Sequence, residues 1–238
     1  MDVSHSRPHK VFDKAPVRPL DVFAKSLSHV VSASPFVDES QKHPRVTVTT
    51  GDARKLPYRS SFFDLVITSP PYLNAIDYMR CSKFALIWMG RKILELRETR
   101  SSCVGAEVGI SDRESMGRLN KLARIPARRN LPDRWRRILD RYIIDMTNVV
   151  MEIARVLKPG GRAVFVLGDS RVRGVAVSNS QIVKTIAQEV GLVLDDCERR
   201  NLVKRRRYLP PPDEATTRGQ LVQRMGYEVI LRFTRPTL

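Results

Sequence analysis

The fold of this chain is decided by the stretch Phe63-Asp64-Leu65-Val66-Ile67-Thr68-Ser69-Pro70-Pro71-Tyr72. Its first six residues form a short, nearly continuous apolar run, which is typical of a strand buried on both faces of a parallel sheet. Two consecutive prolines end the run, because each fixes φ and lacks the N–H group that a sheet ladder uses. We therefore expect a buried strand over 63–68 that runs directly into a rigid turn.

Upstream of this strand the pattern changes twice. The segment Val46–Thr50 is β-branched and alternating and ends at Gly51-Asp52, which predicts another strand running into a turn. Before it, segment 1–44 is rich in proline, and apolar residues recur at helical spacing only after Pro19. We expect one amphipathic helix in that segment, and a single domain over 45–238.

Downstream, a helix is expected over 76–89, followed by a polar, arginine-rich stretch, 91–134, which we interpret as an insertion or loop region. A long helix over 135–157 follows, and Lys158-Pro159-Gly160-Gly161 ends it with a basic last turn, a proline and glycines.

The remaining elements are a strand over 162–167, a helix over 180–190, a strand from Leu192 and a last strand over 227–233. Strands alternate with helices almost to the end of the chain. This order predicts an α/β fold with a doubly wound, mostly parallel sheet and a ligand site at the carboxyl ends of its strands.

Composition limits the function classes. The 238 residues are 42% hydrophobic and 28% charged, which is a globular balance, and the formal net charge of +17 favours a polyanionic partner. A merely soluble basic protein is the alternative. The three cysteines have no paired spacing, the amino terminus lacks the apolar stretch of a secretory signal, and no apolar run reaches a membrane span. We expect a reduced, cytoplasmic protein without a metal or a membrane partner.

The loop after the 63–68 strand suits a specific chemistry. An exocyclic amine of a nucleic-acid base is a poor nucleophile because its lone pair is delocalised into the ring. The Ser69 hydroxyl and the Pro70 carbonyl are placed to accept its two hydrogens, which would favour a pyramidal, reactive nitrogen. Tyr72 offers a flat face on which an extruded base could stack. The alternative is a structural proline turn capped by an aromatic residue.

The segment Thr68-Ser69-Pro70-Pro71-Tyr72-Leu73-Asn74-Ala75-Ile76-Asp77-Tyr78 resembles motif IV of amino-methylating DNA methyltransferases. Its serine form is more similar to cytosine-N4 enzymes than to adenine-N6 enzymes. The resemblance extends from about Arg45 onward and includes Lys158-Pro159-Gly160-Gly161. It implies a Rossmann-like class I methyltransferase fold, S-adenosylmethionine as methyl donor, and Ser69, Pro70, Pro71 and Tyr72 as the catalytic loop.

The same resemblance implies a donor site. Gly51-Asp52-Ala53 is similar to motif III, and with Thr68 it would line the site of S-adenosylmethionine. The acid of Asp52 suits the adenine amine of that donor, whereas the alternative is an Asx turn or a cap. Asp169, after the strand ending at Leu167, would line the pocket or serve as a cap.

One part of the family pattern is missing. Such enzymes hold the methionine part of the donor on a glycine-rich loop after their first strand, and the nearest string here places Lys25 and Leu27 where glycines are needed. The chain resembles an enzyme without its first strand. A truncated product, a rearranged loop and one subunit of a split enzyme with a partner polypeptide are the alternatives, and each predicts an exposed sheet edge.

Arginines concentrate in two places, and both are expected to contact the phosphates of double-stranded DNA with a flipped base. The candidate DNA-binding residues are Arg128, Arg129, Lys204, Arg205, Arg206 and Arg207. The 91–134 stretch is the candidate for target recognition. Two other functions remain open: an RNA-base methyltransferase, and a catalytically silent, DNA-binding remnant.

Overall fold

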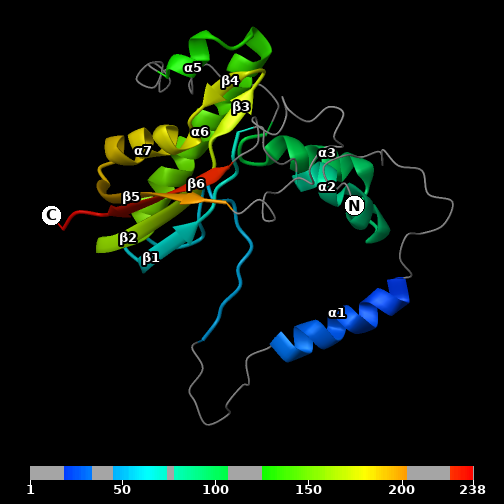
Figure 1. Ribbon diagram of the computed structural model, residues 1–238. Helices are drawn as coiled ribbons and strands as arrows, with labels where there is room; N and C mark the ends of the chain where they lie inside the picture. The colour runs from blue at the N-terminus through cyan, green and yellow to red at the C-terminus, as the bar shows by residue number, and fades with distance from the viewer. Residues whose placement is uncertain (1–18, 34–44, 74–77, 107–124, 203–225, 238) are drawn as a thin grey trace. The chain divides into compact units, whose positions relative to one another are not determined.

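The computed structural model describes residues 19–33, 45–73, 78–106, 125–202 and 226–237 (Figure 1). The chain divides into two compact units, and the boundary between them lies between Thr50 and Gly51. Lys204 to Arg207 fall outside the described residues, so their expected DNA contacts stay a prediction.

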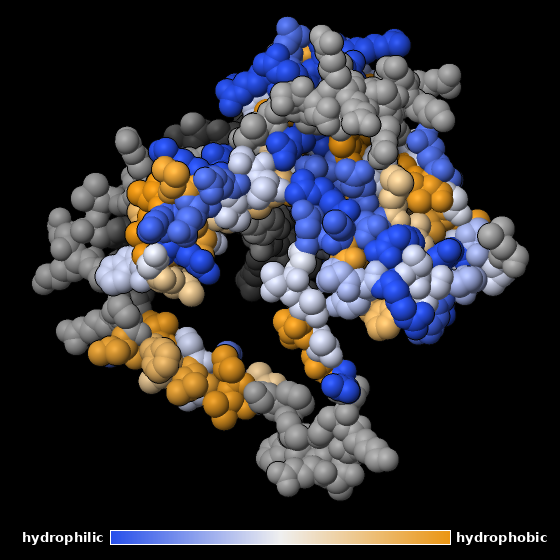
Figure 2. Space-filling model, turned by 180° about the vertical axis from the view of Figure 1, so that it is seen from behind, coloured by the Kyte–Doolittle hydropathy of each residue, from blue (hydrophilic) through white to orange (hydrophobic). Residues whose placement is uncertain are grey.

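The first unit contains helix α1, Pro19–Ala33, as the apolar spacing predicted. Its apolar side chains, Phe23 and Leu27 among them, are exposed and appear as orange residues along the helix in Figure 2. The expected strand at Val46–Thr50 is absent, and Val46 and Val48 are 81% and 93% exposed. That prediction was wrong because a β-branched segment becomes a strand only when a neighbouring strand accepts its backbone hydrogen bonds, and no described strand pairs with it.

The second unit is built on a four-stranded sheet in the order β1-β2-β6-β5. The strands are β1 Phe63–Thr68, β2 Leu157–Leu167, β5 Val193–Asn201 and β6 Tyr227–Thr234. β1 is parallel to β2, whereas β6 is antiparallel to both β2 and β5. The α/β class is as expected, and the sheet is mixed in its described part.

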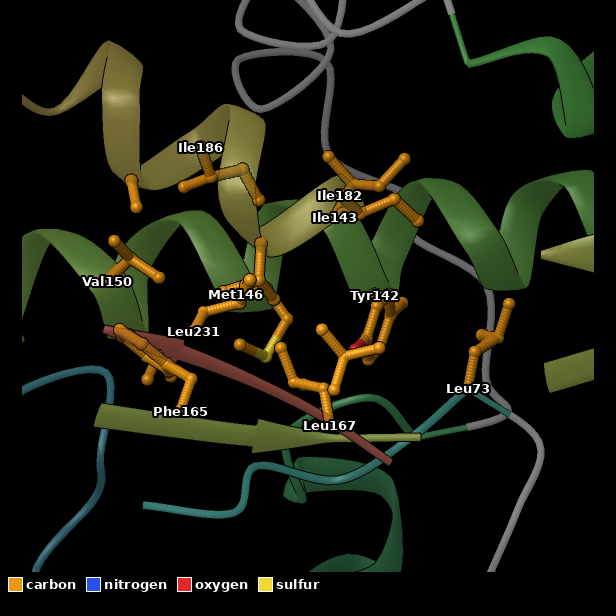
Figure 3. Packing of buried hydrophobic residues seen from close by; sticks show 14 of the residues in the cluster. Leu73, Tyr142, Ile143, Met146, Val150, Phe165, Leu167, Ile182, Ile186 and Leu231 are labelled. Atoms are coloured by element: carbon orange, nitrogen blue, oxygen red, sulfur yellow. The ribbon is translucent and has the colours of Figure 1, made fainter. Parts of the chain in front are cut away.

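Two helices cover one face of this sheet. They are α6 Asp133–Val156, which contacts β2, and α7 Asn179–Glu189, which contacts β5 and β6. The α6 side chains Tyr142, Met146 and Val150 pack between the two helices and the strands, against Phe165 and Leu231 (Figure 3). Alternation places every second residue of a central strand on this face, which is why Ala163, Phe165 and Leu167 are fully buried.

The opposite face is open beside β1. The register pairs Leu65 with Arg162 and Ile67 with Val164, so these residues point away from the helices. Leu65 is 50% exposed and Ile67 is 68% exposed. The expected burial of this strand on both faces is therefore wrong in the described structure, because β1 is at the end of the sheet and the helices α6 and α7 cover only the other face. Among the described residues, β1 has a neighbour on one side only, and its other edge is unpaired.

The glycines after α6 are required by the start of β2. The pairing of β1 with β2 jumps from Phe63–Leu157 to Leu65–Arg162, so the residues between them form a bulge. Gly160 has φ +74°, and a β-carbon on Gly161 would lie 2.8 Å from the carbonyl oxygen of Lys158. Only glycine fits this turn without strain.

The described part of the second unit also contains three smaller helices and a hairpin: helices α2 Tyr78–Trp88, α3 Ile93–Ser102 and α5 Pro126–Arg129, and the hairpin of β3 Ser170–Val172 with β4 Val175–Val177. The expected helix over 76–89 is therefore confirmed within its described part. The 91–134 stretch is partly helical rather than a loop throughout, and the hairpin was not expected. No helix in the described ranges is long and apolar enough to cross a membrane.

Candidate functional site

The Ser69–Tyr72 loop lies at the carboxyl end of β1, beside the carboxyl end of β2. The Ser69 hydroxyl donates to the carbonyl oxygen of Val166 in β2, 3.1 Å away, and lies 3.1 Å from the Tyr72 hydroxyl. Because its proton is directed at Val166, the exposed Ser69 oxygen keeps lone pairs that can accept a hydrogen from a substrate. A hydrogen-bond acceptor is what activation of an amine requires at this position.

The rest of the loop is fixed by packing. Pro70 is buried, Pro71 and Tyr72 are half-buried, and Leu73, directly after the loop, is 1% exposed in the main core (Figure 3). The Tyr72 hydroxyl also lies 3.4 Å from the carbonyl oxygen of Val166. Tyr72 is thus held at its hydroxyl and packs against the core, and its side chain stays partly exposed.

Asp52 is held by its neighbour Arg54. The Arg54 amide donates to the Asp52 carboxylate at 2.9 Å, which is the Asx turn given as the alternative, and the Arg54 side chain donates through Nε and Nη2 as well. These hydrogen bonds from Arg54 lower the pKa of Asp52 below its ordinary value. The Asp52 side chain is still 47% exposed, so the ionised carboxylate can accept a further hydrogen bond from an amine.

Arg54 connects Asp52 to the long helix. Its Nη1 donates to Asp145 of α6 at 2.9 Å, and Asp145 also accepts the amide of Gly105 at 2.9 Å. A β-carbon on Gly105 would lie 3.2 Å from the Tyr142 ring and 4.0 Å from Pro71. Arg54, Asp145 and Gly105 therefore link the Asp52 turn to the surroundings of the Ser69–Tyr72 loop.

Tyr142 lies beneath this loop. Its ring is completely buried, and among the described residues its hydroxyl has no hydrogen-bond partner. Burial, together with the nearby Tyr72 and Asp169, raises the pKa of Tyr142, so the group is neutral at physiological pH.

Asp169 serves as a cap. Its carboxylate accepts the amide and the hydroxyl of Ser180 in the first turn of α7, both at 3.0 Å. It also accepts the Tyr227 hydroxyl at 3.2 Å, while the Arg199 guanidinium lies 3.5 Å above the Tyr227 ring. Burial first, and then Asp169, raise the pKa of Tyr227. Of the two expected functions of Asp169, capping is the one that the contacts support.

Arg128 and Arg129, the candidate DNA-binding residues that the structure describes, differ in ion pairing and in exposure. Arg128 donates to Asp140 through two nitrogens, at 2.7 Å and 3.0 Å, and is half-buried, whereas Arg129 is exposed. The other candidate DNA-binding positions, Lys204 to Arg207, lie outside the described ranges. The guanidinium of Arg128 therefore has a structural ion pair in addition to any contact with phosphate.

Sequence reasoning missed Arg54, Gly105, Tyr142 and Asp145 as parts of this site. Asp145 carried a signal, because it lies on the apolar face of a helix whose neighbouring positions on that face, Tyr142 and Met146, are core residues. A buried acid requires a partner, but the pattern does not say which of many arginines it is.

Comparison with known proteins gives relatives of one kind. The chain is 26% identical over 202 residues to the type II methyltransferase M.AvaI of Nostoc sp., a match that covers 76% of this chain and 41% of that protein. It is 26% identical over 166 residues to the type II methyltransferase M.BsoBI of Geobacillus stearothermophilus, covering 54% and 31%. The chain thus spans about two fifths or less of the length of these curated relatives. No family model matches it.

Solved structures show weaker likeness. The PvuII DNA methyltransferase (cytosine-N4-specific) is 14% identical with a TM-score of 0.42, covering 78% of this chain and 47% of that one. TTHA0409 from Thermus thermophilus, a putative DNA modification methylase solved with S-adenosyl-L-methionine, is 16% identical with a TM-score of 0.39, covering 79% and 54%. At these TM-scores no conclusion depends on them. In its sequence, over three quarters of its length, the chain is similar to type II methyltransferases.

Proposed function

We propose that this chain is the base-binding part of a DNA amino-methyltransferase, which transfers a methyl group from S-adenosylmethionine to cytosine N4 in preference to adenine N6. The observation that supports this most is the exposed Ser69 hydroxyl, whose proton is directed at Val166, so that its oxygen can accept a hydrogen from a substrate. The resemblance of the Thr68–Tyr72 segment and the similarity to type II methyltransferases support the same reaction.

The chain's own residues activate and orient the base. Ser69 Oγ and the Pro70 carbonyl oxygen each accept one hydrogen of the exocyclic amine, so that the nitrogen becomes pyramidal and its lone pair points away from the loop. Tyr72 stacks on the flipped base, an interaction of about 1–3 kcal/mol that offsets the few kcal/mol of extrusion. The amine nitrogen would form its new bond to the methyl carbon as the bond between that carbon and the donor sulfur breaks, so that S-adenosylhomocysteine leaves and the nitrogen loses one proton to solvent.

S-adenosylmethionine would supply an electrophilic methyl group on its sulfonium. The residues present fit one end of this donor: Asp52 is ionised, half-exposed and able to accept from the adenine amine. Gly51 and Ala53 flank it in sequence, and Thr68 is the last residue of β1. The glycine-rich loop that would hold the methionine end is absent from the sequence. The fit is thus partial.

A second polypeptide, or a segment joined to this one, supplies the missing part in our proposal. The edge of β1 that no described strand pairs with, together with the exposed Leu65 and Ile67, is the surface on which further strands would add. The relatives are more than twice as long as their matched parts, which leaves room for such a region.

Methyl transfer from labelled donor to duplex DNA tests the function, followed by mass analysis of the nucleosides. Ser69→Ala should lower kcat on the order of a hundredfold, because it removes one preorganised acceptor. Ser101→Ala is the matched control, since the Ser101 hydroxyl is exposed and bonds only within its own helix.

The nucleoside product distinguishes the alternatives. N4-methylcytosine in DNA would support the proposal in full, and N6-methyladenine would show that the target base is adenine rather than cytosine. Methylated RNA without methylated DNA would overturn the proposal that DNA is the substrate. DNA binding without transfer, in the presence of the supplementary region, would identify a silent remnant.

A further inference from the structure

The hairpin of β3 and β4 projects arginines from a firmly packed base. Val172 and Val177 are each 1% exposed in the core, and alternation turns Arg171 to the opposite side, where it is exposed. The two strands pair from Ser170–Val177 to Val172–Val175, which leaves Arg173 and Gly174 as a two-residue turn. The hairpin is therefore a rigid support with a basic tip.

The residue at the tip is an unusual choice. Arg173 has φ +51° and Gly174 has φ +82°, the backbone that a type I′ turn needs at both central positions. Glycine, asparagine and aspartate are preferred there, because a β-carbon in the left-handed region is disfavoured. The conformational stability of the turn therefore does not account for the arginine at this position.

A second arginine faces the same aromatic ring. The guanidinium carbons of Arg173 and Arg134 lie 5.7 Å and 5.9 Å from the ring centroid of Trp135, at the start of α6. Each cation is attracted to the indole, but the two positive charges repel each other. A polyanion would relieve that repulsion.

Further arginines extend this surface. Helix α5 contacts both β4 and α6, and it lies beside the hairpin at the top of Figure 1. We use the name hairpin surface for its exposed cations, Arg129, Arg134, Arg137, Arg171 and Arg173. Among the described residues no ion pair joins them to a carboxylate, whereas Arg200 and Arg232 in the sheet are paired with acids. The region around α5 is largely hydrophilic in Figure 2.

The hairpin surface lies near the catalytic loop. The hairpin begins at Ser170, four residues after Val166, whose carbonyl anchors Ser69. Trp135 precedes Tyr142 by seven residues on α6, a distance of about 10 Å along the helix axis. Duplex DNA carries one negative charge per about 1.7 Å of axis, so a base at Ser69 brings several phosphates within reach of these arginines.

We infer that the hairpin surface binds the phosphate backbone of duplex DNA beside the flipped base, with Arg171 and Arg173 as the central contacts. The inference rests on the proposed function for its ligand. It predicts phosphate contacts that position the duplex and are independent of its sequence.

The experiment measures binding of a labelled duplex DNA of random sequence to the full chain at a series of salt concentrations. The double variant Arg171→Gln, Arg173→Asn should bind about tenfold more weakly or worse and should lower the salt slope by about 1.8, since each phosphate contact contributes about 0.9. Asparagine suits the turn better than arginine, so the melting temperature should stay the same or rise. Reduced binding is then not a consequence of unfolding.

Arg59→Asn is the matched control. Arg59 is also an exposed arginine over an aromatic ring, 5.3 Å from the centroid of Phe62, but it precedes the amino end of β1. Its binding and salt slope should match the unsubstituted chain. Equal affinity and slope for the double variant and for Arg59→Asn would overturn the inference.

Measuring methyl transfer alongside the titration separates this inference from the proposed function. A reduced salt slope in the double variant, with no methyl transfer by the parent chain even when the missing region is supplied, would support the hairpin surface and count against the reaction. Methyl transfer by the supplemented parent chain, with an unchanged salt slope in the double variant, would support the reaction and overturn the inference about the hairpin surface.

Discussion

Asp145 is the residue on which the site's scaffold depends most. It is 5% exposed on α6, and its carboxylate pairs with Arg54 at 2.9 Å and with Arg141 at 3.5 Å while accepting the amide of Gly105. A buried carboxylate is stable only when its partners replace the water it has lost. Asp145 therefore determines where the Asp52 turn meets the helix.

Replacing Asp145 tests this dependence. Asp145→Ala should lower the free energy of unfolding by about 3 kcal/mol or more, because it leaves Arg54 and the Gly105 amide without their acceptor. Asp133→Ala, on the same helix but with an 81% exposed side chain, should change it by about 0.5 kcal/mol or less. Urea unfolding measures both. Equal costs for the two variants would contradict the structural importance of the buried pair.

Replacing Tyr142 should stabilise the fold, whereas replacing Asp145 should destabilise it. Since its buried hydroxyl has no partner among the described residues, Tyr142→Phe should raise the free energy of unfolding by about 1 kcal/mol. Thermal or urea unfolding checks this. Destabilisation by the variant would mean that the hydroxyl makes a hydrogen bond in solution.

At the scale of elements, the segment after Asp52 is attached to α6 through Glu152. This carboxylate accepts the Leu56 amide at 2.7 Å and the Arg155 guanidinium at 2.8 Å. The hydrogen bond from Arg155 lowers the pKa of Glu152 below its ordinary value. The attachment is therefore a charged one, and it responds to acid.

The sign of that response follows from the lowered pKa. The contribution of Glu152 is present above the pKa of the unfolded chain, about 4.3, and is lost as the pH falls through the lower folded value. Glu152→Gln should therefore be less stable than the parent at neutral pH and should lose less stability on acidification below about pH 4. Unfolding midpoints in urea over a pH series report this. Parallel pH curves for the two proteins would contradict it.

The two faces of the sheet should differ in their sensitivity to truncation. Phe165→Ala, on the face covered by α6 and α7, should cost about 3–5 kcal/mol, because it opens a cavity in the core. Ile67→Ala, on the open face of β1, should cost less than about 1 kcal/mol. Chemical unfolding of both variants tests this contrast. A large cost at Ile67 would mean that this face is covered in the folded chain.

At the scale of the whole molecule, donor binding should depend on a further region. The chain alone should bind S-adenosylmethionine weakly, because in our proposal its residues hold only the adenine end of the donor. Adding the part of M.AvaI outside the matched region should strengthen binding and protect the β1 edge from hydrogen exchange. Calorimetry and exchange measure the two effects. Tight, stoichiometric binding by the chain alone would contradict this prediction.

The sequence by itself determined the elements whose signals are local. Three such elements are the strand and proline turn at 63–71, the periodic helix before Lys158, and the glycine turn at 160 and 161. Each is set by the allowed φ angles, the apolar periodicity or the stiffness of its own residues. These same residues were enough to predict that the Ser69–Tyr72 loop follows the carboxyl end of a strand, while its catalytic function stays a proposal.

Only the tertiary structure decided the rest, because pairing is a property of two segments. Val46–Thr50 has the pattern of a strand, but no described strand pairs with it. The residues of β6 do not predict that this strand runs antiparallel to β2. The partner of Asp145 and the meeting of Arg173 with Trp135 join residues far apart in the sequence. Such contacts form only when long stretches of chain between the two residues close into loops, and when a buried charge finds a partner. Local sequence patterns therefore do not predict them.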